Sequence, residues 1–232
     1  MRLISSLFLT LGATLSLDAS AIDQKDLKDV DISELTRETQ KTIHAEGVHL
    51  VWWIPPEYWE ASVKNDASIT SEHRKALMDV MEKYSMLAIV QAEVSPFGSF
   101  SFYDRDAISK GLKIEITNGK GRKTVKPLED VPDELQMLLK VLAPILEAAL
   151  GNMGKNLNFY VLADKVKGDR LLSPYGHDTL SVSLASKQGS VLGPAEFSMP
   201  LDALYVPRKC PNGKPAHVSW VVCPWDGTQL PQ

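Results

Sequence analysis

The residues best suited to chemistry lie near the C-terminus, in CPNGKPAHVSWVVCPWDGTQL (210–230). Cys210 and Cys223 are the two cysteines of the chain. Together with His217 and Asp226 they offer two sulfurs, a nitrogen and an oxygen, a donor set that a tetrahedral Zn²⁺ site could use. Alternatively, the two cysteines form a disulfide, which would close about 14 residues and stabilise the fold by about 3 kcal/mol. Free thiols are the third interpretation.

A second candidate is the polar stretch GDRLLSPYGHD (168–178). Ser173, His177 and Asp178 supply a hydroxyl, an imidazole and a carboxylate, the groups that nucleophilic catalysis uses. However, no G-x-S-x-G elbow surrounds Ser173, and adjacent His177 and Asp178 cannot easily form the orienting hydrogen bond of a triad. A hydrolase built on this loop is therefore the alternative function and not the first.

Four large aromatic residues fall within WWIPPEYW (52–59). Such rings can form a platform for a sugar, a peptide or a partner protein, and they can equally pack in a core. Trp52 and Trp53 point to opposite faces of a strand, so burying Trp52 would turn Trp53 outward. We therefore predict Trp53 and Trp59 as the exposed, binding residues of this segment.

HAEGVH (44–49) gathers two imidazoles and a carboxylate. A metal site is one interpretation, but the P-C-x-x-C that completes the H-x-E site of zinc deaminases is missing. The simpler interpretation leaves His44 and Glu46 exposed at a helix end and starts a strand at His49.

Hydrophobic periodicity and turn signals divide the rest of the chain into helices and strands. Helices are predicted for 22–46, 71–84 and 132–150, and strands for 49–54, 87–94, 99–103, 112–117, 122–125, 157–163 and 179–184. Asp31, Thr70 and Asp104 are suitable helix caps. Because hairpins alternate irregularly with helices, the pattern predicts a single α+β domain with a mainly antiparallel sheet.

The longest predicted helix is rich in leucine. Its apolar stripe consists of Leu135, Leu138, Leu139, Leu142, Ile145, Leu146 and Ala149, which matches a period of 3.6 residues. This stripe is expected to face the core. Pro144 should kink the helix because it removes a backbone donor.

The N-terminus has the order of a secretory signal. Arg2 precedes an apolar run from Leu3 to Leu17, and Ala19-Ser20-Ala21 forms an A-x-A cleavage site. The run is shorter than the roughly 20 residues of a membrane helix, so no transmembrane anchor is expected. We predict cleavage near Ala21 and a periplasmic or secreted product. Since that compartment is oxidising, the Cys210–Cys223 disulfide is preferred to zinc.

Composition excludes some functions. The formal net charge of −4 argues against a general nucleic-acid binder, which needs a basic surface. The apolar fraction of 44% is sufficient for a folded core.

The C-terminal motifs resemble a zinc ribbon that has lost half of its ligands. CPWDG (223–227) is similar to one knuckle, with Asp226 where the second cysteine would stand, and CPNG (210–213) is similar to its partner. The resemblance implies two turns brought side by side without a retained metal.

The whole mature chain is also similar to a family of exported bacterial proteins to which no activity is attached. The resemblance rests on GSFSFYDRDAI (98–108), GNMG (151–154), NFYVLAD (158–164) and CPWDGT (223–228). It implies one domain with an appended tail, and it transfers no site residue.

These observations predict a signal peptide over 1–21, an α+β domain over 22–207 and a small disulfide-closed hairpin tail over 208–232. The expected function is a non-catalytic interaction module without a cofactor. Its expected partner is a protein or glycan of the cell envelope.

Overall fold

The computed structural model describes residues 22–64, 66–166 and 169–231. The predicted signal peptide, 1–21, lies outside the described residues. The chain is a mixed α+β protein with antiparallel sheets, which confirms the predicted fold class. Its strands form two larger sheets where the pattern suggested one.

The first sheet has five strands within the described residues. They are β1 (Gln40–Thr42), β2 (Val48–Ile54), β3 (Tyr84–Val94), β4 (Phe100–Phe102) and β7 (Asn158–Ala163). The long strand β3 is central: β2 lies along one edge, and β7 and β4 follow one another along the other. This position explains the near-continuous apolar run of β3, since both of its faces are covered.

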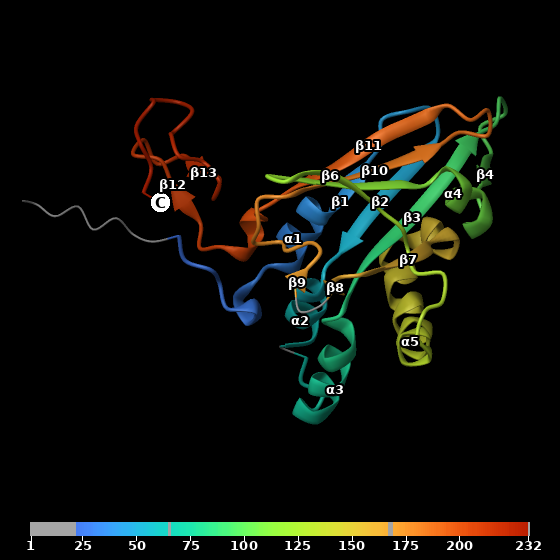
Figure 1. Ribbon diagram of the computed structural model, residues 1–232, viewed down its shortest axis with the longest axis horizontal. Helices are drawn as coiled ribbons and strands as arrows, with labels where there is room; N and C mark the ends of the chain where they lie inside the picture. Colours follow the sequence, from blue (N-terminus) through green and yellow to red (C-terminus); the bar gives the residue numbers. More distant parts are fainter. Residues whose placement is uncertain (1–21, 65, 167–168, 232) are drawn as a thin grey trace, which may run out of the picture.

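The second sheet has the order β11-β10-β5-β6. Its strands are β5 (Lys113–Asn118), β6 (Gly121–Val125), β10 (Thr179–Ala185) and β11 (Val191–Ser198). It lies against one face of the first sheet, where the rings of Trp53 and Phe197 meet edge to face at 6.1 Å. The helices α2, α3 and α5 lie on the other side of the first sheet (Figure 1).

Three of the helices begin at side-chain caps that the sequence predicts. The bounds are η1 (Leu27–Asp29), α1 (Ile32–Thr39), α2 (Pro56–Lys64), α3 (Ser71–Met81), α4 (Arg105–Gly111), α5 (Asp133–Ala149), η2 (Gly151–Asn156) and η3 (Asp202–Leu204). The predicted caps are confirmed: the side chains of Asp31, Thr70 and Asp104 accept backbone N–H groups of α1, α3 and α4.

Two segments differ from the sequence prediction for identifiable reasons. The first helix ends at Thr39, because Gln40 turns extended and pairs with Trp52 of β2. Pro55 follows the last residue of β2, and Pro56 starts the helix α2, where its fixed φ and missing N–H suit the first helical position. Pairing with β2 outweighed helical propensity in the first case, and in the second the proline after Pro55 opened a helix.

Helix α5 is less buried than its leucine stripe predicts. Leu135 is fully buried, whereas Leu138, Leu139 and Leu142 are only partly buried against the core. The side chains of Ile145, Leu146 and Ala149 lie outside the described ones. Among the described side chains of α5, burial is therefore deepest in the first turn.

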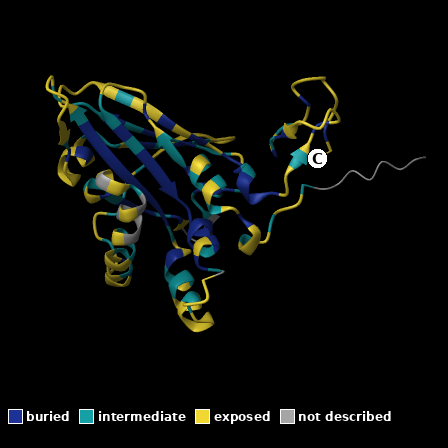
Figure 2. Ribbon diagram, turned by 180° about the vertical axis from the view of Figure 1, so that it is seen from behind, coloured by how far each residue is buried: buried dark blue, intermediate teal, exposed yellow. Residues whose placement is uncertain are grey.

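The C-terminal tail extends from the body of the protein and is mostly exposed, whereas buried residues concentrate in the central strands (Figure 2). It contains β12 (Arg208–Lys209) and β13 (Pro215–Ala216), and the short pair β8 (Lys165–Val166) and β9 (Asp169–Arg170) lies in the body. Across the described ranges, none of the helices combines the length and apolarity that crossing a membrane requires.

Candidate functional site

The prediction that Trp53 and Trp59 are exposed is wrong. Trp53 is 0% and Trp59 3% exposed. The indole Nε1 of Trp53 donates to Ser85 Oγ at 2.6 Å, between the two sheets. Alternation along β2 does not turn one face to water, because helices cover one face and the second sheet the other. Buried indoles cannot serve as a stacking platform, and no binding role is retained for them.

The residues of the hydrolase alternative do not form a triad in the structure. Ser173 Oγ accepts the backbone N–H of Tyr175 at 3.3 Å, so it closes a local turn. The side chain of His177 is exposed. In the described part of the chain, no hydrogen bond joins His177 to Ser173 or to Asp178.

Arg170, in the same loop, instead joins a buried ion cluster. Its guanidinium pairs with both carboxylate oxygens of Glu57 on α2, and it donates to Asp164 Oδ2 at 2.8 and 3.2 Å. Asp164 is fully buried, and its Oδ1 accepts the N–H of Leu172 at 2.9 Å. The polar loop is thus tied to the body by charges 113 and 6 residues away in sequence. The sequence carries no signal for this pairing.

In the tail, Cys210 and Cys223 are both buried and approach each other to 2.6 Å without a bond between them in this structure. Each opens a turn that ends in a glycine with positive φ, at Gly213 and Gly227. Burial, together with the neighbouring Cys223 thiol, raises the pKa of the Cys210 thiol to about 11. The Cys210–Cys223 disulfide stays a prediction. The short distance between the two cysteines is compatible with it.

The four ligands of the zinc alternative are only partly brought together. The N–H of Thr228 and, after it, the neighbouring Cys223 thiol lower the pKa of Asp226, whereas His217 Nδ1 lies 2.8 Å from Ser219 Oγ. Nowhere in the described ranges do three His, Cys, Asp or Glu side chains form a group suited to a metal ion.

The most distinctive surface lies at one tip of the two sheets, where two turns share a sequence pattern. SPFGS (95–99) joins β3 to β4, and SKQGS (186–190) joins β10 to β11. In each turn the glycine N–H donates to the first serine's carbonyl oxygen, at 2.8 and 2.9 Å respectively. The last serine's N–H donates to the first serine's Oγ at 3.1 Å in both. We call these segments the twin turns.

Glycine is required in both turns, since Gly98 and Gly189 have φ of 78° and 82°. The repeated hydrogen bonds make each turn internally closed. Phe97 and Gln188, the residues before the glycines, are therefore held in turns of defined backbone conformation.

The first of the twin turns carries an exposed apolar group. Phe97 is 98% exposed, Phe100 55% and Val94 37%. The rings of Phe100 and Phe102 lie 6.0 Å apart. Phe97, at the tip of a tight turn, contributes little to the core. Folding alone therefore does not explain why a phenylalanine occupies this position.

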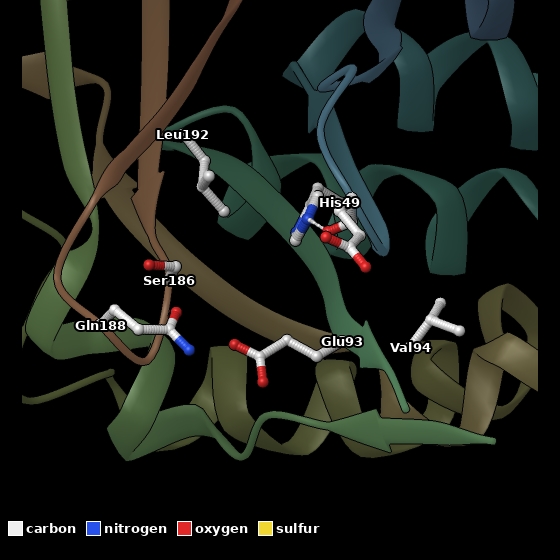
Figure 3. A pocket seen from close by; sticks show the side chains of 7 residues that line it. His49, Glu93, Val94, Ser186, Gln188 and Leu192 are labelled. Carbon is white, nitrogen blue, oxygen red and sulfur yellow. Dashed lines mark hydrogen bonds between the residues drawn. The ribbon is translucent and has the colours of Figure 1, made fainter. Parts of the chain in front are cut away.

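A hollow of about 270 Å³ lies between the twin turns and the start of β2 (Figure 3). Its lining residues are Glu46, His49, Glu93, Val94, Ser186, Gln188 and Leu192. The carboxylate of Glu93 and the amide of Gln188 point toward one another across it (Figure 3). We call it the tip hollow.

His49 is held at the tip hollow by the loop before β2. Its Nε2 lies 2.9 Å from the carbonyl oxygen of Glu46. A carbonyl can only accept, so Nε2 carries a proton, and in that tautomer of the imidazole Nδ1 is an acceptor. Gly47 permits this arrangement: its φ is 111°, and a Cβ there would lie 2.2 Å from the Ala92 carbonyl oxygen.

Two buried acceptors beside the tip hollow have no donor. His49 and Gln91 are cross-strand partners on β2 and β3, and each is 1% exposed. His49 Nδ1 and Gln91 Oε1 make no hydrogen bond within the described residues. Gln91 cannot turn to help, because its Nε2 donates to the carbonyl of Ala185 at 2.8 Å. In the described part of the chain the indole N–H groups of Trp52 and Trp59 also make no hydrogen bond. Of these four groups, only His49 Nδ1 belongs to a residue that lines the hollow.

Glu93 completes the polar side of the hollow. Its Oε1 accepts the hydroxyl of Tyr103 at 2.5 Å and the N–H of Lys187 at 3.3 Å, and Oε2 lies 3.4 Å from Lys187 Nζ. The Tyr103 hydrogen bond holds the pKa of Glu93 below its usual value. Burial and the same carboxylate raise the pKa of Tyr103 to about 12.

Sequence reasoning noted His49 and Glu46 but not this site. His44 and Glu46 were predicted to be exposed at a helix end. They are exposed, but they lie in the loop between β1 and β2, because α1 already ends at Thr39. His49 was predicted only as the start of a strand. The available signal was the repeated S-x-x-G-S pattern. Its two copies are 91 residues apart, and only the fold brings them together.

No family model matches this chain, and no curated protein or solved structure matches it either. The resemblance to exported bacterial proteins therefore stays a prediction. The geometry of the tip is what bears on function.

Proposed function

We propose that the chain is an exported, non-catalytic interaction module that binds a partner protein through its tip. The observation that carries this proposal is Phe97, 98% exposed at the end of a closed turn. Apolar residues gathered on a surface and rimmed by polar groups are typical of protein-binding sites.

The build of the tip supports binding in a second way. Both twin turns are closed by their own hydrogen bonds, and Lys187 of the second reaches Glu93 and Ser101 of the first sheet. A preorganised surface loses little conformational entropy when a partner binds. Phenylalanine and valine side chains, unlike tyrosine or tryptophan, offer a sugar few polar edges, so a protein partner is favoured over a glycan.

Export is part of the proposal and rests on the order of charge, apolar run and A-x-A site at the N-terminus. The expected partner is then a protein of the cell envelope. Nothing in the arrangement of Ser173, His177 and Asp178 favours the hydrolase alternative.

Site-specific photocrosslinking tests the proposal. Phe97 of the full-length protein is replaced by benzoylphenylalanine. The variant is expressed in the organism that carries the gene, and the cells are irradiated. We expect a discrete adduct with one envelope protein, identified by mass spectrometry. The purified partner should then bind the wild type at least about tenfold more tightly than Phe97→Ser, as expected for an aromatic hot spot.

The matched control carries the same crosslinker at Met137, a 68% exposed apolar residue on α5. Adducts that are identical from both positions would indicate nonspecific contact and contradict the proposal. Equal affinity of wild type and Phe97→Ser for the captured protein would contradict it as well.

A further inference from the structure

The tip hollow has more acceptors than donors. Its floor contributes His49 Nδ1, which is buried and has no donor within the described residues. Gln91 Oε1, also without a donor, belongs to the adjoining strand and does not itself line the hollow. Its sides contribute the carboxylates of Glu46 and Glu93. A buried acceptor left unpaired costs free energy, so a group that brings hydrogen-bond donors into the hollow relieves that cost.

We propose that the tip hollow receives a basic side chain, a guanidinium or ammonium group, from the protein that binds the tip. This inference rests on the proposed function, since the basic group belongs to that partner. Such a group carries only donors and a positive charge, which complements the bare His49 Nδ1 beside two carboxylates.

Other occupants fit the chemistry less well. An anion would meet Glu46 and Glu93, of which only Glu93 has a cationic neighbour, Lys187, among the ion pairs of the described residues. A metal ion needs several ligands in one shell, and the described side chains form no such group. A volume of about 270 Å³ is small for a cofactor and suits one extended side chain.

Lys187 shows how Glu93 holds such a cation. Its Nζ lies 3.4 Å from Glu93 Oε2 and 5.4 Å from the centre of the Tyr103 ring. This ammonium does not line the hollow, and its side chain is 52% exposed. Glu93 thus has an internal cation on one side and the open hollow on the other, and the two cations would compete for its charge.

The test uses small probes on the intact protein, so it does not require the partner. Methylguanidinium chloride is titrated while ¹⁵N spectra follow the ring nitrogens of His49, and N-methylurea serves as the neutral probe of similar shape. We expect saturable shifts at His49 Nδ1 with methylguanidinium, and binding at least about tenfold weaker with N-methylurea.

Two substitutions should change the affinity for methylguanidinium in opposite directions. Glu93→Gln should weaken methylguanidinium binding at least about tenfold, whereas Lys187→Met should strengthen it several-fold by removing the competing cation. His49→Phe should abolish the saturable shifts elsewhere in the hollow. Equal response to the charged and neutral probes, or no change in Glu93→Gln, would overturn the inference and indicate water alone in the hollow.

The two proposals can fail separately. Phe97→Ser lies outside the hollow and should leave methylguanidinium binding unchanged. A Phe97 adduct without any probe binding would overturn the inference while the proposed function stands. Probe binding without a specific adduct would overturn the assignment of the basic group to a partner protein.

Discussion

Two polar clusters are buried in this protein, and they are saturated to different degrees. In the Arg170 cluster, one guanidinium supplies donors to both Glu57 and Asp164, and a backbone N–H satisfies the remaining oxygen of Asp164. At the tip hollow, His49 and Gln91 retain one bare acceptor each. A closed set of charges holds a loop in place, while an open set of acceptors is available to a ligand.

Mutations should affect the two clusters differently, because the acceptors of the Arg170 cluster have hydrogen bonds and ion pairs to lose. Removing one partner from a closed buried ion cluster leaves a charge without compensation, which is strongly destabilising. An acceptor that already lacks a donor has no such bond to lose. Variants in the two clusters should therefore separate stability from binding.

The largest expected effect is on the closed cluster. Arg170→Met removes the donors of two buried carboxylates and should lower the free energy of unfolding by about 3–5 kcal/mol. Urea unfolding followed by tryptophan fluorescence measures this. Methylguanidinium binding at the tip should be unchanged at low denaturant.

The matched control is Lys165→Met. Lys165 pairs with Glu82 at 3.0 Å near the same cluster, but both side chains are well exposed. Its loss should cost less than about 1 kcal/mol. Equal losses for the two variants would mean that burial does not distinguish the pairs.

The C-terminal tail has a small apolar core, so its stability should depend strongly on whether its two cysteines are bridged. That core consists of Cys210, Ala216, Cys223 and Leu230, with Trp220 packed against it. If the cysteines are bridged, protein purified without reductant has no titratable thiol and no bound zinc. Reduction should then destabilise it by about 3 kcal/mol.

Single substitutions distinguish the bridge from a zinc site. Under a bridge, Cys210→Ser and Cys223→Ser should have similar effects, and His217→Ala should change little. Two reactive thiols with one zinc per chain, lost on chelation, would refute the bridge.

The smallest expected effect concerns pH at the tip. The folded pKa of Glu93 is depressed, chiefly by the Tyr103 hydroxyl. Its contribution to stability is therefore present above the unfolded pKa, about 4.3, and is lost as pH falls through the lower folded value. Tyr103→Phe should raise the pKa of Glu93 toward its usual value and flatten this acid dependence. Carboxyl ¹³C titration measures the shift, and an unchanged pKa would contradict the hydrogen bond.

The sequence alone determined features that depend on near neighbours. Strand β2 follows from its β-branched and aromatic residues, and hairpin β5–β6 from Asn118 and Gly119 at its turn. The caps at Asp31 and Thr70 follow from side chains that bond the next turn of their own helix. In each case the groups that decide the structure lie within a few residues of one another.

Only the tertiary structure decided which faces are covered and which distant groups meet. Trp53 is buried because a second sheet, built from residues far along the chain, covers its strand. Arg170 finds Glu57, and His49 finds Gln91, across 113 and 42 residues. No local pattern encodes such pairings, because they arise from sheet register and layer packing. The candidate site combines local turns with such distant contacts, Glu93 with Lys187 among them, so it is complete only in the folded chain.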